Sequence, residues 1–176
     1  TLNFDYIETE AAERYDILIT EIYADPTPSL GLPETEYIEL YNQSNKAINL
    51  NELQFSNKST IIELPFYVLQ SNEYVIIYEE NIFINFSDYG KTLAVESFPP
   101  LANSEDELTI ADLNDNLIHT INYTTAWYRD GNKSNGGFSL EMKSLNNFCQ
   151  KAKNWSASIA TIGGTPGQRN SVYENF

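Results

Sequence analysis

Carboxylates gather in one short, proline-rich stretch of the chain. The stretch reads DPTPSLGLPETEYIEL and contains Asp25, Glu34, Glu36 and Glu39. Calcium binds about six to eight oxygens, often from carboxylates and loop carbonyls. The residue types therefore suit a cation site, provided that the fold brings their side chains together.

Glu21 lies on the strand-like segment before this stretch, and Glu39 lies on the strand-like segment with which the stretch ends. If the two segments pair antiparallel, the carboxylates approach each other, which is unfavourable unless a cation or a base intervenes. A regular strand places Glu36 and Glu39 on opposite faces, so these two cannot share an ion. We therefore predict a Ca²⁺ site with Glu21, Asp25 and Glu39 as candidate ligands. The alternative is that these carboxylates point into water.

Three tyrosines flank the same stretch. Tyr23 precedes it, Tyr37 lies near its end and Tyr41 follows it, and the last two have the spacing of one strand face. Exposed aromatic rings near a loop would suit recognition of a peptide or a glycan, so the three are candidate binding residues. The alternative is that they pack under the loop or against the N-terminal residues.

The other residues that could do chemistry stand alone. His119 is the one histidine, and a lone histidine in a strand is most often at the surface or satisfied by hydrogen bonds. Cys149 has no histidine near it in sequence, which favours a buried, inert thiol. No nucleophile, phosphate-loop or zinc motif occurs. We predict no catalytic residue, no enzyme activity, and no cofactor other than the calcium considered above.

The segment DLNDN, from Asp112 to Asn116, begins like a calcium loop. Leu117 and Tyr123 occupy the positions where an EF-hand needs Gly and Glu, so that match fails. Two β-rich runs flank the segment, and Asn and Asp tolerate positive φ. We therefore predict a β-hairpin with its turn at these residues.

Period-two patterns and turn residues roughly every ten positions predict an all-β fold of the immunoglobulin-like sandwich type. In Ile17–Tyr23 the pattern alternates Ile17, Ile19, Glu21 and Tyr23 against Leu18, Thr20 and Ile22. No helical periodicity covers eleven or more residues. We divide the chain into a leader or linker (1–15), a β-sandwich (16–125) with a proline-rich insertion after its first core strand, and an irregular C-terminal extension (126–176) packed on the sandwich.

The extension contains aromatic residues and a glycine-rich turn, GGTPG. We expect Trp127, Phe138, Leu140 and Trp155 to be largely buried and to tie the extension to the sandwich. Gly163, Gly164 and Gly167 would serve turn geometry, because no Lys-Ser/Thr pair follows them as in a phosphate-binding loop.

The charge balance limits the partners. The chain has 25 acidic and 10 basic residues and a net charge of −15. A phosphate backbone needs Lys and Arg, so nucleic acid is not expected as a partner. No apolar run approaches the length of a membrane span, and no membrane insertion is expected.

Several segments together resemble the lamin tail domain, in the form found in Bacteroidetes. These are ILITEIYADPTPSLGLPETEYIELYN, INLNELQFSN and SFPPLANSEDELTIADLNDNLIHTINY, with an extension containing WYRDGNKSNGGFSLEM and GGTPGQRNS. The resemblance implies an immunoglobulin-like sandwich in a secreted or cell-surface, and so extracytoplasmic, protein. Lamin tails of the nucleus bind partners, some of them DNA or chromatin. The acidic charge argues against carrying DNA binding over, and the family supplies no catalytic residues.

We therefore expect a non-catalytic interaction or structural module whose partner is a protein or a glycan. The alternatives are a calcium-stabilised adhesion or carbohydrate-binding module and, ranked last, a hydrolase acting through paired carboxylates.

Overall fold

Seven consecutive buried residues, Ile17–Tyr23, form β1 in the middle of the larger of two sheets. The computed structural model describes residues 8–81, 83 and 85–174, and not the side chains of 149 and 150. In this part of the chain the larger sheet has the order β12-β11-β1-β2-β7-β8. Its other strands are β2 (Tyr37–Asn42), β7 (Tyr74–Glu79), β8 (Thr92–Val95), β11 (Leu140–Met142) and β12 (Trp155–Ala157). Neighbouring strands are antiparallel except for β7 and β8.

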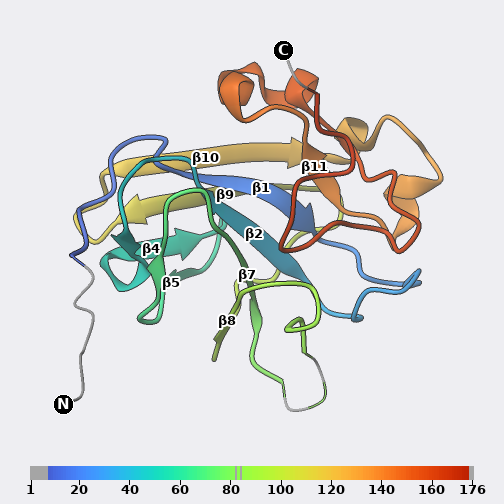
Figure 1. Cartoon of the computed structure of the whole chain (residues 1–176). Coiled ribbons are helices and arrows are strands. Elements are labelled where there is room, and N and C mark those ends of the chain that lie inside the picture. Colours follow the sequence, from blue (N-terminus) through green and yellow to red (C-terminus); the bar gives the residue numbers. More distant parts are fainter. Residues whose placement is uncertain (1–7, 82, 84, 175–176) are drawn as a thin grey trace.

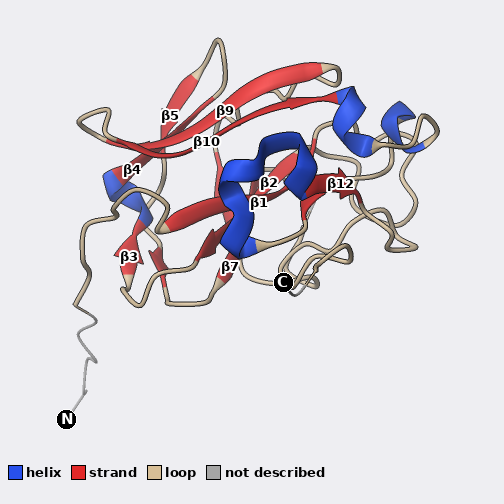
Figure 2. Cartoon of the chain, turned by 90° about the horizontal axis from the view of Figure 1, so that it is seen from above, coloured by secondary structure: helices blue, strands red, loops and turns tan. Residues whose placement is uncertain are grey.

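The second sheet has the order β10-β9-β4-β5 and lies across the first (Figures 1 and 2). Its strands are β4 (Leu53–Ser56), β5 (Ile61–Glu63), β9 (Glu105–Asp112) and β10 (Leu117–Thr124), and β3 (Ile48–Asn49) pairs with β6 (Val68–Leu69) beside it. The 3-10 helices are η1 (Leu50–Glu52), η2 (Thr125–Tyr128), η3 (Lys133–Asn135) and η4 (Leu145–Asn154). The described residues contain no α-helix, and none of their helices could cross a membrane. The predicted all-β, immunoglobulin-like sandwich is confirmed.

The hydrophobic core fills the space between the sheets. Side chains from β1 and β2 meet side chains from β4, β9 and β10, which are apolar at alternate positions. Burying such side chains stabilises each by roughly 1.5–3 kcal/mol relative to exposure, so this layer dominates the folding energy. The fully or nearly fully buried members include Ile17, Ile19, Ile22, Ile38, Leu40, Phe55, Leu108, Ile110, Ile118 and Ile121.

A β-bulge interrupts β1 at Thr20. Ile19 pairs with Leu40, but Glu21 pairs with Glu39, so one extra residue lies on β1. The predicted alternation, with Ile19 and Glu21 on one face, is therefore wrong beyond residue 19. The extra residue reverses the facing of all that follow. It keeps Ile22 in the core and moves Glu21 to the outer face of the sheet.

His119 connects the two sheets at this bulge. Its ring Nδ1 accepts a hydrogen bond from the backbone N–H of Ile19 at 2.9 Å, and its side chain is buried. Burial lowers the pKa of His119 from 6.5 to about 4, so the ring is neutral at pH 7. Of the two expectations for a lone histidine, a surface position or a hydrogen-bonded one, His119 fits the second. Cys149, expected to be a buried thiol, lies outside the described side chains.

The predicted hairpin is formed by β9 and β10. Asp112 Oδ1 accepts the backbone N–H groups of Asn114 and Asn116, both at 2.8 Å, and Asp115 has a φ of 64°. The side-chain oxygens of Asp112 therefore form hydrogen bonds within their own turn. This confirms the hairpin interpretation.

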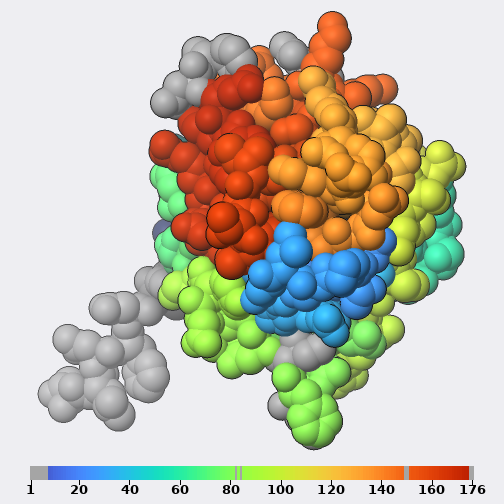
Figure 3. All heavy atoms as spheres, turned by 90° about the vertical axis from the view of Figure 1, so that its right-hand side faces the viewer, coloured from blue at the N-terminus to red at the C-terminus, as the bar shows by residue number. Residues whose placement is uncertain are grey.

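The C-terminal extension does more than pack on the sandwich, because β11 and β12 extend the larger sheet beyond β1. Trp127, Trp155 and Leu140 are buried as expected, whereas Phe138 is half-buried. The indole rings of Trp127 and Trp155 lie 6.1 Å apart between centroids. Figure 3 shows the extension, in orange and red, lying against the blue loop between β1 and β2.

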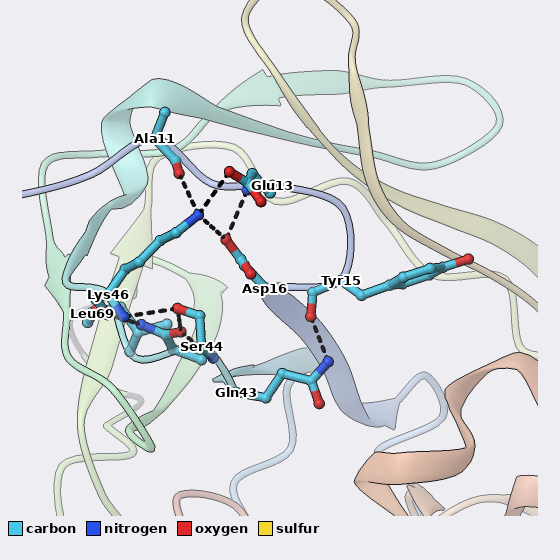
Figure 4. Close-up of polar contacts among 9 residues, drawn as sticks. Ala11, Glu13, Tyr15, Asp16, Gln43, Ser44, Lys46 and Leu69 are labelled. Atoms are coloured by element: carbon cyan, nitrogen blue, oxygen red, sulfur yellow. Dashed lines mark hydrogen bonds and ion pairs between the residues drawn. The ribbon is translucent and has the colours of Figure 1, made fainter.

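The described part of the N-terminal leader is held by Lys46. The Lys46 ammonium lies 2.9 Å from Asp16 Oδ2 and 3.3 Å from Glu13 Oε1, and it donates to the carbonyl of Ala11 (Figure 4). Residues 8–13 form neither a strand nor a helical turn, and residues 1–7 lie outside the described residues. The sandwich thus makes ordered contacts with residues that precede its first strand.

Candidate functional site: a buried row of glutamates

Three glutamates form a row across the outer face of the larger sheet. The strand register pairs Glu21 of β1 with Glu39 of β2 on one side and with Glu141 of β11 on the other. All three have an exposed fraction of 0%. The expected approach of Glu21 and Glu39 is confirmed, and Glu141 joins them from the extension. Isolated charges are costly to bury, so the row needs either hydrogen bonds or protons.

Glu21 occupies the centre of the row and has two very different carboxyl oxygens. Its Oε1 accepts three hydrogen bonds, from the Tyr37 hydroxyl at 2.8 Å, the Ser139 hydroxyl at 2.6 Å and the Thr165 backbone N–H at 2.9 Å. Its Oε2 is buried and has no hydrogen-bond partner among the described residues. The missing partner disfavours the ionised form most, because this oxygen would then carry part of an unsolvated charge.

Glu39 accepts hydrogen bonds from β1 and from the C-terminal extension. The Thr20 hydroxyl, placed by the bulge, donates to Oε1 at 2.6 Å. The backbone N–H of Gly167 in the extension donates to Oε2 at 2.7 Å. Glu39 therefore links the bulge of β1 to the C-terminal segment.

Glu141 is bound almost entirely by the last residues described. The Thr165 hydroxyl donates to Oε1 at 2.8 Å, and the Ser171 hydroxyl and the Val172 N–H donate to Oε2 at 2.7 and 3.1 Å. Asn170 adds two bonds nearby, from its Nδ2 to the carbonyls of Thr20 and Met142. The row thus holds residues 165–172 against the sheet through hydrogen bonds.

The glycine-rich turn lets the backbone come this close. Gly163 and Gly167 have φ values of 98° and 79°, which residues other than glycine rarely adopt. Gly164 serves a different purpose, because a Cβ there would lie 2.6 Å from Glu21 Oε1 and 2.8 Å from the Tyr37 hydroxyl. The expectation that these glycines serve turn geometry holds for Gly163 and Gly167, while Gly164 provides room for the buried carboxyl.

Burial sets the protonation of the row. Burial, followed by the neighbouring Glu141 charge, raises the pKa of Glu21 from 4.5 to about 8. Burial and then the Glu21 charge raise the pKa of Glu39 well above its usual value. The hydrogen bonds to both side chains act in the opposite direction and are outweighed. Because the two groups interact, they lose their protons as a coupled pair, and the row holds at least one proton at pH 7.

The predicted calcium ligands are only partly brought together. Glu21 and Glu39 are neighbours, but Asp25 lies in the loop that follows β1, where its backbone carbonyl accepts from the Gly137 N–H. No group of three or more His, Cys, Asp or Glu in the described part of the chain could hold a metal ion. N–H and O–H donors, which satisfy carboxylates without a cation, already occupy the glutamate oxygens other than Glu21 Oε2. The calcium site stays a prediction.

The three tyrosines lie inside the molecule. Tyr23 and Tyr37 are fully buried with ring centroids 5.2 Å apart, and Leu32 and Phe86 pack in the same cluster. The Tyr41 hydroxyl donates to Asn72 at the other end of β2. Of the two interpretations considered, exposure does not hold, and packing under the β1–β2 loop holds for Tyr23 and Tyr37. A binding role for them stays a prediction that requires the loop to open.

Paired carboxylates also occur in a surface groove beside the β1–β2 loop, lined by Glu34, Glu36 and Glu79 among others. Burial raises the pKa of Glu36, and the Leu101 N–H donates to its Oε2 at 2.9 Å. The groove has a volume of about 230 Å³, below the roughly 300–1,000 Å³ of typical ligand pockets. Glu36 thus acts as an anchor for the segment around Leu101.

Sequence reasoning missed Glu141, Ser139 and Thr165. Each lies more than a hundred residues from Glu21 in the chain, and no local pattern connects them. The available signal was Glu141 itself, an acid between two apolar residues in the strand LEM, where a buried strand face would need a partner for it.

The fold and the row together define an immunoglobulin-like β-sandwich whose C-terminal segment is fastened over one sheet. The lamin tail domain family matches residues 10–125, more than half of the chain. The protein therefore belongs to the lamin tail domain family, and that domain is an immunoglobulin-like module without catalytic function. The match ends at η2, so Glu21 and Glu39 lie within it, whereas Glu141 and the covering residues 165–172 lie beyond it. No curated protein matches the chain in a sequence comparison.

Proposed function

We propose that this domain is a non-catalytic interaction and structural module of a secreted or cell-surface bacterial protein. The observation that supports the proposal is the use of the glutamate row. The acids with the strongest displacement from their usual pKa are sealed from solvent and bind the chain's own C-terminal segment. Such groups face the chain's own residues and cannot reach a substrate, so a strongly perturbed pKa here indicates structure and not catalysis.

Charge and surface chemistry support a protein or glycan as the partner. A net charge of −15 repels nucleic acid and anionic lipid headgroups. Exposed apolar side chains such as Phe66 and Phe83 are available for contact with a partner. The extracytoplasmic location follows from the family resemblance and is part of the proposal.

The location is tested by an epitope tag inserted after Gly131, an exposed turn residue whose Cβ position has no atom within 4 Å. The full-length parent protein carries the tag in its native bacterium. We expect antibody to label intact cells, or the tag to be recovered from the medium. A cytoplasmic protein with the same tag serves as the control. Detection only after lysis would refute the proposed location.

The calcium-stabilised alternative makes a different prediction for melting. A cation that binds the folded state stabilises it by about 2.7 kcal/mol at a hundredfold excess over its Kd. Because the glutamate oxygens already accept protein hydrogen bonds, we expect the same Tm in millimolar CaCl₂ and in EGTA at pH 7. A rise in Tm with calcium that Glu39→Gln abolishes would support the calcium site instead.

A further inference from the structure

The two sheets leave their edges open on the same side of the sandwich. Among the described residues, β5 pairs only with β4, and β8 pairs only with β7. Residues 62–65 of the β5 region and 94–97 of the β8 region line a single groove of about 560 Å³. Figure 1 shows β5 and β8 at the ends of their respective sheets. Unpaired strand edges present free N–H and C=O groups to any chain that lies beside them.

The free edge of β8 can be assigned to particular residues. The carbonyls of Lys91 and Val95 accept hydrogen bonds from Ile76 and Glu80, which places these carbonyls on the side of β7. Successive peptide groups of a strand point to opposite sides, so the N–H and C=O groups of Ala94 point away from β7. Glu96 lies in the bend directly after β8, and no backbone hydrogen bond is formed by its N–H among the described residues. These groups lie at the groove and are free to pair with an added strand.

The groove combines apolar walls with an acidic rim. Ile62, partly exposed, and Pro65, exposed, supply apolar surface, whereas Leu64 and Val95 line the groove but are buried. Ile61 and Phe66, next to the lining residues in sequence, are 58% and 70% exposed. Such exposure of large apolar side chains along an edge strand is a recognised mark of an interaction site.

Three carboxylates, from Glu63, Glu80 and Glu96, line the groove, and all three residues are exposed. In the described part of the chain none of them forms an ion pair; the ion-paired lysines contact other acids. The groove therefore carries uncompensated negative charge beside apolar surface and unpaired backbone, which is complementary to lysine or arginine alternating with apolar residues.

We infer that this groove binds an extended, basic polypeptide segment of a partner protein by adding it as a strand to β8. Main-chain hydrogen bonds to Ala94, with Glu96 directly after it, hold the added strand, its apolar side chains contact Ile62 and Pro65, and its cations face the glutamates. The inference rests on the proposed function, since it names the class of partner that the module recognises.

The test uses an acetylated and amidated peptide with four Lys-Val repeats as the probe, followed by two-dimensional NMR of the ¹⁵N-labelled domain. We expect the amide signals of Ala94 and Glu96 to shift on titration, and a Glu-Val peptide of equal length to leave them unchanged. No shift at these amides with the Lys-Val peptide would overturn the inference. The cell-surface test above would be unaffected by that result, so the two proposals fail independently.

Two variants separate charge from backbone pairing. Glu63→Lys/Glu80→Lys/Glu96→Lys should weaken peptide binding at least tenfold. Its matched control, Glu10→Lys/Glu52→Lys/Glu107→Lys, changes exposed residues outside the groove and brings the net charge to the same −9, from −15 with two units per substitution. Ala94→Pro removes the outward N–H and leaves every charge, and it should also weaken binding. Equal weakening by both triple variants would show unspecific attraction and contradict the inference.

Discussion

Replacing Glu21 with glutamine is expected to make the protein more stable at pH 9 and to change its stability little at pH 4.5. The glutamine Oε1 can accept the same bonds from Tyr37, Ser139 and Thr165 that the carboxyl accepts now. The glutamine amide does not ionise, so it avoids the cost of a buried negative charge. The variant thus retains the hydrogen bonds while removing the titration.

The direction of this pH dependence follows from the number of protons bound in the folded and unfolded states. The pKa of Glu21 is about 8 in the folded state and 4.5 without the protein environment, so between these values the folded state holds a proton that the unfolded state has lost. The contribution of Glu21 to the free energy of unfolding is complete below pH 4.5 and is lost as the pH rises through about 8. At about 1.4 kcal/mol per unit, the loss approaches 5 kcal/mol. Coupling to Glu39 divides this loss between the two groups.

Urea denaturation at pH 4.5, 7 and 9 measures the effect. Glu107→Gln is the matched control, because it makes the same chemical change at an exposed position of β9. We expect the stability difference between Glu21→Gln and the parent protein to grow by several kcal/mol across this range, while Glu107→Gln shows no such growth. A Glu21→Gln variant that is destabilised equally at all three pH values would mean that folding does not raise the pKa of Glu21.

Gly164→Ala is expected to destabilise the contact between the extension and the sheet by roughly 1–3 kcal/mol, the usual cost of overpacking. The added methyl group would lie 2.6 Å from Glu21 Oε1, 2.8 Å from the Tyr37 hydroxyl and 2.9 Å from Leu32 Cδ1. None of these buried groups can move far without breaking a hydrogen bond or opening a cavity. The N–H of Thr165, the next residue, would be displaced from Glu21.

Hydrogen exchange of the amides of Thr165, Gly167 and Val172 measures this effect, because these amides donate to the row. We expect faster exchange in Gly164→Ala than in Gly131→Ala, whose Cβ has no atom within 4 Å. The strands β9 and β10 should retain their protection in both variants. Unchanged protection of the three amides would show that the extension is not held through this contact.

The sheets of this protein could be predicted from local patterns, because alternation, turn residues and the Asp112–Asn116 hairpin signal act over a few residues. The bulge could not. The residues before and after Thr20 each alternate regularly, so the extra residue is revealed only by the pairing of β1 with β2. Its consequence is large, since it decides that Glu21 faces the extension and not the hydrophobic core.

The candidate site was predicted in part for a related reason. Glu21 and Glu39 flank one loop, so an antiparallel pairing of neighbours in sequence was enough to bring them together. Glu141 and Thr165 reach the same place through strand β11 and the glycine turn, which depend on long-range packing. Tyr37 and Tyr41 share a strand face as predicted, whereas the bulge reverses the predicted facing of Tyr23. The loop covers Tyr23 and Tyr37, so of the two interpretations considered, packing under the loop holds for this pair.

The central claim is that the row beneath the extension holds a proton at neutral pH. The most direct measurement is a ¹³C NMR titration of the glutamate side-chain carboxyl carbons, with the Glu21 signal assigned through Glu21→Gln. We predict a Glu21 midpoint near pH 8 and a Glu39 midpoint well above its usual value. Midpoints near 4.5 for both residues in the folded protein would contradict the account.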